Sequence, residues 1–258
     1  MRHAAACLAL LAVLAAPARA APAPPCPAFD NGELDVGALP HLDAALKHGG
    51  KLGILAIGSA GVRPDAELPF AGSGAPPAAP APPASPTGFP WQFAHALETA
   101  VKGLHVSVTV RGGRLLSAAD MEAMIEAELA HGGYRLVLWQ TGTVDAVQDL
   151  PPGDFYQALS DGAASVAGAG ADLILVDPQY SRFLEANANL QPYLSAMQSV
   201  GDLPGVMLFD RYALMRDWAD AGAIDLEHAA KPDRPAQAAR LHACLARALA
   251  HMVIPATP

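Results

Sequence analysis

The stretch LGILAIGSA, residues 52–60, decides the fold of this chain. Residues 52–57 are apolar or glycine without polar alternation, which is typical of a strand buried on both faces of a parallel sheet. The tight turn Gly58-Ser59-Ala60 follows directly. Because open parallel sheets bind ligands beyond the carboxyl ends of their strands, we expect the functional site at this turn.

The rest of the chain alternates strands with helices. Further strands are predicted at 105–110, 136–140, 173–176 and 206–209. Helices are predicted at 39–48, 91–101, 117–130, 154–169, 191–200 and 236–253. Ser117 is expected to cap its helix, with Asp120 at the N3 position. This order predicts an α/β domain, a three-layer α/β/α sandwich of flavodoxin-like layout around a parallel sheet of about five strands.

The N-terminus predicts an export signal. Arg2 gives a basic start, residues 4–16 form an apolar run too short to span a bilayer, and Ala18-Arg19-Ala20 is a small-x-small cleavage site. A buried N-terminal helix is the alternative. We expect cleavage after Ala20 and a periplasmic or secreted protein. No other stretch is long enough to span a membrane.

Removal of the signal leaves an acidic chain with two cysteines. Losing Arg2 and Arg19 changes the formal net charge from −9 to −11, which disfavours nucleic acid as a partner. In an oxidising compartment, Cys26 and Cys244 are expected to form a disulfide that contributes roughly 4 kcal/mol. Two free buried thiols are the alternative.

Two segments differ in composition from the rest of the chain. Residues 21–38 form a Pro/Ala-rich leader with no core-forming pattern, so the domain is expected over 39–258. Residues 72–88 consist almost wholly of Gly, Ala, Pro and Ser and predict a flexible loop. This loop is either a flap over the site or an inert surface insertion.

Four candidate site segments occur along the chain, three of them shortly after predicted strands. They are Gly58-Ser59-Ala60, Arg111-Gly112-Gly113, Gly142-Thr143-Val144-Asp145 and, near the C-terminus, Asp225-Leu226-Glu227-His228. Together they resemble the SGNH (GDSL-type) hydrolase family over about residues 52–253. VLWQTGT, DPQY and FDRYALMRDW look like an exported bacterial branch of that family.

The resemblance implies hydrolysis of an ester, such as an acylated carbohydrate or a lipid. In that family a serine after the first strand attacks the carbonyl, and a histidine accepts its proton. His228 matches that base, and Asp225 matches the aspartate that orients it. The serine N–H, a glycine N–H after the second strand and an asparagine side chain after the third form the oxyanion hole.

Several positions depart from the family pattern. Ala60 stands at the nucleophile position, with Ser59 one residue before it, and Val144 stands where the family has asparagine. The glycine of the second segment aligns near Arg114 or Leu115. Gly112 and Gly113 could supply that backbone N–H instead if the loop has shifted.

Two hypotheses about function therefore stay open. In the first, Ser59 is a displaced nucleophile served by His228 and Asp225. In the second, the protein is a non-catalytic relative that binds a glycan, an acyl chain or a partner protein in the old cleft. Ser59 could equally bond its own turn, and Asp225 with His228 could be an ordinary surface pair.

The remaining polar residues give weaker signals. Asp145 is expected in a strand-end turn, and Asp177 and Gln179 are expected to line the pocket. The scattered histidines show no metal-ligand spacing, and no phosphate-binding glycine motif is present. We therefore expect no metal or cofactor, a small-molecule or glycan ester ligand, and a monomer.

Overall fold

The computed structural model describes residues 25–29, 39–58 and 88–254. The turn residues Ser59 and Ala60, the predicted export signal and residues 72–87 of the predicted loop lie outside the described residues.

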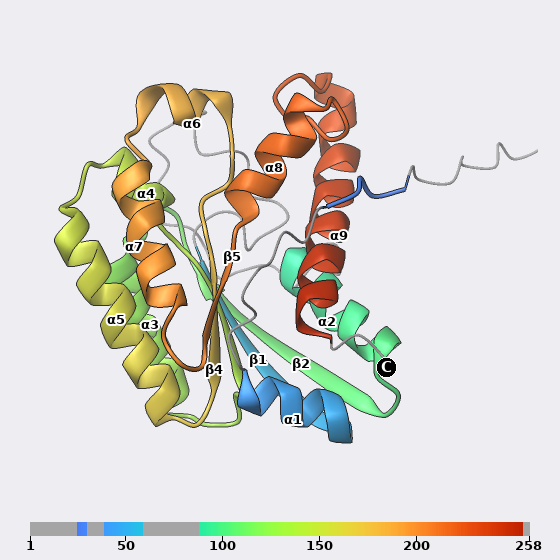
Figure 1. Ribbon diagram of the computed structural model, residues 1–258, viewed down its shortest axis with the longest axis vertical. Helices are drawn as coiled ribbons and strands as arrows, with labels where there is room; N and C mark the ends of the chain where they lie inside the picture. The colour runs from blue at the N-terminus through green and yellow to red at the C-terminus, as the bar shows by residue number, and fades with distance from the viewer. Residues whose placement is uncertain (1–24, 30–38, 59–87, 255–258) are drawn as a thin grey trace, which may run out of the picture.

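A parallel sheet of five strands forms the centre of the molecule, in the order β2-β1-β3-β4-β5 (Figure 1). The strands are β1 (Gly50–Gly58), β2 (Leu104–Gly112), β3 (Leu136–Gln140), β4 (Asp172–Val176) and β5 (Val206–Phe209). Every neighbouring pair is parallel. The predicted fold class and all five predicted strands are confirmed, with strand ends that differ by at most two residues.

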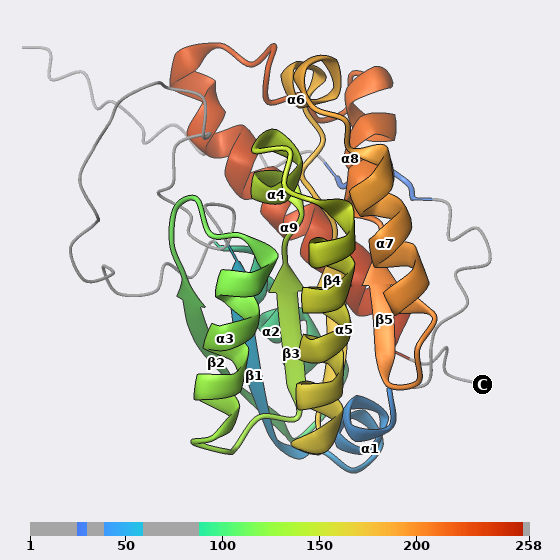
Figure 2. The same cartoon turned by 90° about the vertical axis from the view of Figure 1, so that its left-hand side faces the viewer.

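Helices cover both faces of this sheet. They are α1 (Pro40–His48), α2 (Phe89–Ala100), α3 (Ala118–Leu129), α4 (Thr143–Val147), α5 (Pro152–Gly168), α6 (Arg182–Asn187), α7 (Gln191–Gly201), α8 (Arg211–Asp220) and α9 (Arg234–Val253). Figures 1 and 2 show α3, α5 and α7 together on one face and α2 and α9 on the other. This arrangement gives the predicted three layers.

In the part of the chain that the structure describes, three α-helices, α4, α6 and α8, and a 3-10 turn at Lys231–Asp233 were not predicted. α4 replaces the strand-end turn expected around Asp145. α6 and α8 begin at side-chain caps, since Ser181 accepts the N–H of Leu184 and Asp210 accepts the N–H of Ala213. The predicted cap of α3 is confirmed as a capping box of Ser117 and Asp120.

The predicted disulfide between Cys26 and Cys244 is present, with 5.3 Å between the two Cα atoms. Around it, the segment 25–29 lies against α8 and α9. Arg240 donates a hydrogen bond to the carbonyl of Pro25, and the Trp218 indole donates to the carbonyl of Ala28. This part of the predicted leader therefore contributes to the packed domain, contrary to its composition.

Burial of Trp139 against α5 depends on a glycine. Trp139, in β3, is fully buried, and a Cβ atom built on Gly162 would lie 2.5 Å from its Cζ3 atom. Such a distance is far inside normal contact. The helix can approach the sheet this closely only because Gly162 has no side chain.

Gly162→Ala is therefore expected to lower the free energy of unfolding by about 1–3 kcal/mol, since one methyl group overpacks the core. Thermal unfolding followed by circular dichroism measures this. Gly168→Ala, in the same helix, is the matched control because nothing lies within 4 Å of its added Cβ atom. Equal melting temperatures for the two variants would contradict the packing argument.

Buried charges lie where β4 and β5 end. Asp177 and Arg211 are almost fully buried, and Arg211 donates a hydrogen bond to the backbone carbonyl of Asp177. The Asp177 carboxylate accepts the N–H of Tyr212 at 2.8 Å. Burial, followed by the nearby charge of Asp210, holds the pKa of Asp177 well above its ordinary value. Burial also lowers the pKa of Arg211 to about 10, although Asp177 opposes this.

Because the folded state holds the Asp177 proton more tightly than the unfolded state, stability should fall as pH rises above the ordinary carboxyl pKa. Each unit by which the pKa is raised costs about 1.4 kcal/mol. Asp177→Asn keeps an acceptor for Tyr212 without this cost. We expect the variant to melt at a higher temperature than wild type at pH 7 and at an equal temperature near pH 3.5. Equal destabilisation at both pH values would contradict a raised pKa of Asp177.

Candidate functional site

The carboxyl ends of β1, β2 and β3 meet at one edge of the sheet. Gly58 is aligned with Gly112 of β2 and with Gln140 of β3. The segments that contain Gly112 and Val144 therefore start from adjacent strand ends.

Gly112 is required by the close approach of β1 and β2. Its φ is +149°, and a Cβ atom there would lie 1.8 Å from the carbonyl oxygen of Gly58. No other residue fits this position. Gly113 comes next, and an added Cβ atom there would meet only the side chain of Leu116 at 3.6 Å. The two predicted glycines thus differ, because only Gly112 is fixed by backbone contact.

Leu115 has an unusual backbone conformation. Its φ of 58° is left-handed, which costs a residue with a side chain roughly 1–2 kcal/mol, and its side chain is 68% exposed. This conformation is typical of glycine. Of the two positions aligned with the family's glycine, Arg114 and Leu115, the backbone favours Leu115.

Val144 and Asp145 lie in α4, which follows β3. The left-handed Gly142 precedes them, and both side chains are buried. Asp145 Oδ1 accepts the N–H of Ala118 at 2.9 Å and so ties α4 to the first turn of α3. Burial raises the pKa of Asp145, and the N–H of Ala118 opposes this only in part. Asp145 therefore holds two helices together at the strand ends.

Asp225 and His228 form a hydrogen-bonded pair in the loop between α8 and α9. His228 Nδ1 lies 2.7 Å from Asp225 Oδ2. Burial alone would raise the pKa of Asp225, but hydrogen bonds from the His228 side chain and backbone and from Arg182 lower it to about 2. The carboxylate stays ionised at neutral pH. This is the arrangement that orients a histidine base in ester hydrolases.

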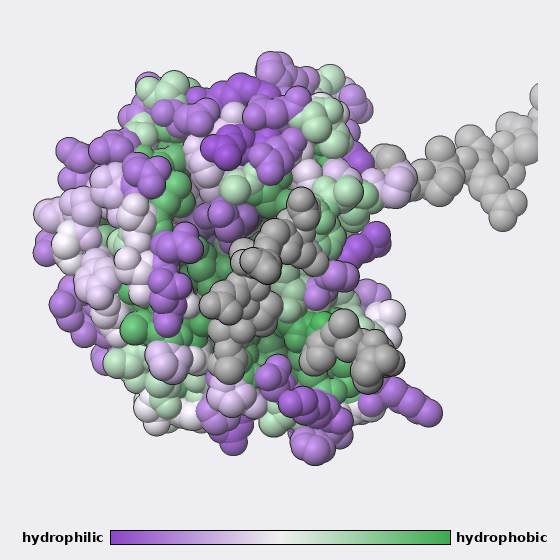
Figure 3. Space-filling model, viewed as in Figure 1, coloured by the Kyte–Doolittle hydropathy of each residue, from purple (hydrophilic) through white to green (hydrophobic). Residues whose placement is uncertain are grey.

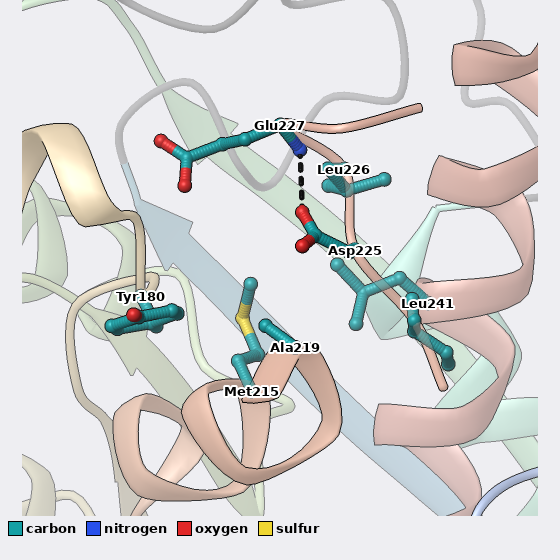
Figure 4. A pocket seen from close by; sticks show the side chains of 8 residues that line it. Tyr180, Met215, Ala219, Asp225, Leu226, Glu227 and Leu241 are labelled. Carbon is teal, nitrogen blue, oxygen red and sulfur yellow. Dashed lines mark hydrogen bonds between the residues drawn. The ribbon is translucent and has the colours of Figure 1, made fainter. Parts of the chain in front are cut away.

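A small cavity lies beneath this pair. Its volume is about 20 Å³, and Tyr180, Met215 and Leu241 line it together with Asp225 (Figure 4). That volume suits one water molecule. Gln179 is half-buried and does not line this cavity.

Sequence reasoning missed Arg182, the first residue of α6. Its Nη1 atom donates to Asp225 Oδ2 at 2.9 Å and lies 3.4 Å from His228 Nδ1. No spacing rule links this arginine to a loop more than forty residues further along the chain. The one local signal that could have placed Arg182 at the start of a helix is the preceding Ser181, a good helix cap.

Over 25–29, 39–58 and 88–254, no group of three or more His, Cys, Asp or Glu side chains is placed to hold a metal ion. No helix within those ranges has the length and apolar character needed to cross a bilayer.

Several solved structures are similar to this chain. A catalytic mutant of an acetylxylan esterase from Geobacillus stearothermophilus is 16% identical with a TM-score of 0.59, covering 80% of this chain and 96% of that one. A lipase/acylhydrolase from Enterococcus faecalis is 15% identical with a TM-score of 0.54, covering 78% and 96%. A lipolytic protein of the G-D-S-L family from Veillonella parvula is 16% identical with a TM-score of 0.51, covering 76% and 96%.

At these identities the likeness shows the fold. No curated protein matches the chain significantly. A sequence model of the Non-GDSL lipase-like family matches residues 25–257, which is most of the chain. The chain shares its fold with hydrolases of the GDSL type, and it belongs to the Non-GDSL lipase-like family.

Proposed function

We propose that this protein binds a carbohydrate or lipid ester at the strand ends and that its ester-hydrolase chemistry is impaired. The assembled Asp225–His228 pair is the observation that carries the proposal, because such a pair is the proton-accepting half of an acyl-transfer site. The solved structures of an acetylxylan esterase and a lipase/acylhydrolase, both similar in fold, support an ester as the ligand class.

The residues at the nucleophile and oxyanion positions argue that hydrolysis is impaired. A histidine base accelerates acyl transfer by taking a proton from a nucleophile, and the family position for that nucleophile holds Ala60. Val144 offers a buried apolar side chain where the family has an amide donor. Loss of one oxyanion donor alone costs roughly 10²–10³ in rate.

Restoring the missing groups tests the proposal. The mature protein is expected to hydrolyse p-nitrophenyl acetate at the background rate. Ala60→Ser combined with Val144→Asn is expected to raise kcat/KM by at least about 100-fold, since it returns a nucleophile and an oxyanion donor. Adding His228→Ala to that double variant is the control and should remove the gain. If the double variant keeps its turnover after His228→Ala is added, the assigned role of the Asp225–His228 pair would be contradicted.

Ser59 is the second candidate nucleophile, because it stands one residue before Ala60. Measurable wild-type turnover that disappears in both Ser59→Ala and His228→Ala would establish this alternative and refute impairment. Turnover that survives both substitutions would come from another source, such as a contaminating esterase.

A non-catalytic binding role is the remaining alternative, and the combination of Ala60, Leu115 and Val144 favours it. Titration of the wild-type protein with an acetylated xylo-oligosaccharide, followed by NMR, separates the cases. Shifts of Asp225, His228 and Tyr180 without product formation are expected for binding. No shifts with this ligand or with a short acyl ester would refute the proposed ligand class.

We also propose that the protein is exported, on the basis of the N-terminal signal pattern. The Cys26–Cys244 disulfide supports this, since disulfides persist in oxidising compartments. In a Gram-negative host, the mature chain is expected in the periplasm or medium, beginning at Ala21, with both cysteines resistant to alkylation until reduction. Mass spectrometry of the N-terminal peptide identifies the first residue of the mature chain, and alkylation before and after reduction shows whether the two cysteines are paired. An intact Met1 in the cytoplasmic fraction would exclude export.

A further inference from the structure

Apolar packing holds the turn that carries Asp225 and His228 only in part, through the half-buried Leu226. Ile224 is buried just before it, but Asp225 and Glu227 are only half-buried and His228 is 73% exposed in its side chain. Figure 3 shows that the end of the molecule formed by α6 and the α8–α9 loop is largely hydrophilic. Polar contacts therefore add to the packing of Leu226 in fixing this turn.

Glu227 connects the turn to the start of α6. Its Oε2 atom accepts the backbone N–H of Arg182 at 2.9 Å, and its Oε1 atom accepts that of Phe183 at 3.3 Å. The first N–H groups of a helix have no partner within the helix. Glu227 supplies that partner for two of them, and Ser181 supplies it for a third, the N–H of Leu184.

Arg182 makes the return contact from α6 to the turn. Its guanidinium donates to Asp225 Oδ2 at 2.9 Å and lies 3.5 Å from Glu227 Oε2 and 3.8 Å from Asp220 Oδ1. The backbone N–H of Arg182 is thus bound by the Glu227 carboxylate, and its guanidinium is bound by the Asp225 carboxylate of the same turn.

These contacts complete the hydrogen bonding of Asp225. Oδ2 takes Arg182 Nη1 and His228 Nδ1, while Oδ1 accepts the N–H groups of Glu227 at 3.0 Å and His228 at 3.1 Å. A carboxylate has about four acceptor positions, so all are used. Rotation of Asp225 would break several hydrogen bonds at once. The orientation of the His228 ring follows from the orientation of this carboxylate.

We propose that Arg182 is a positioning residue for the Asp225–His228 pair, and that with Glu227 it forms a reciprocal clamp between α6 and the 225–228 turn. The inference rests on the proposed role of that pair at the site. Arg182 acts through Asp225 and is not itself a catalytic residue. The contact that joins them spans 43 residues of sequence.

The charges around Asp225 make its ionisation a measure of whether the clamp is intact. Arg182 and His228 face the carboxylate as donors, and the acidic Glu227 and Asp220 with Tyr180 complete its surroundings. Arginine is the permanent cation among these groups. Its removal should therefore weaken the preference of Asp225 for the ionised form, which a mere loss of packing would not do.

The test follows the Asp225 carboxyl by carbon NMR in the mature protein labelled at aspartate, and it needs no turnover. Arg182→Met is expected to raise the titration midpoint of Asp225 by at least about one pH unit. It should also speed hydrogen exchange at the Glu227 and His228 amides. Arg182→Lys keeps the charge and should restore most of the midpoint but less of the amide protection, because it lacks the planar fork of donors.

Arg216→Met is the matched control, since Arg216 is an exposed arginine of α8 outside the clamp. An unchanged Asp225 midpoint in Arg182→Met would overturn the proposal, as would equal shifts in Arg182→Met and Arg216→Met. If Arg182→Met does not fold, Arg182→Lys decides: a wild-type midpoint with faster Glu227 exchange supports the clamp, and wild-type exchange overturns it. Failure of the esterase assays would leave these outcomes unaffected.

Discussion

Parallel pairing of β1 with both β2 and β3 is the constraint on which the rest of the structure depends. It puts Gly58, Gly112 and Gln140 at the same level, so that the loops leaving these strands begin next to one another. The pairing needs glycine at 112, where the two backbones come too close for a Cβ atom. Over most of their length β1 and β3 are apolar on both faces, because helices cover both sides of the sheet.

The proposed site has two unequal halves. On the side of α6, α8 and the turn, a histidine, an aspartate and an arginine are joined by short, charge-assisted hydrogen bonds. On the side of α3 and α4, Val144 is buried and apolar, and Leu115 has a left-handed backbone, which is unfavourable for a residue with a side chain. The first half is thus polar and hydrogen-bonded, whereas the second presents an apolar side chain at Val144.

Much of the fold could be predicted because its signals are local. Strand β3 has the predicted bounds, since five consecutive buried residues end at a glycine-containing turn, and the Ser117 cap follows from adjacent residues. The helices α4, α6 and α8 escaped prediction because they are short or lack a sustained apolar period. The contact between Arg182 and Asp225 could not be predicted, because it arises only when β4 and α8 are already packed.

The Cys26–Cys244 disulfide joins residues 218 positions apart in the sequence. All five strands and almost all helices lie between these two residues, so the folded unit is covalently a closed ring. A single cut by a protease in any surface loop would open the ring without producing separate fragments. After such a cut both pieces would stay linked through the disulfide, so their separation would require a second event.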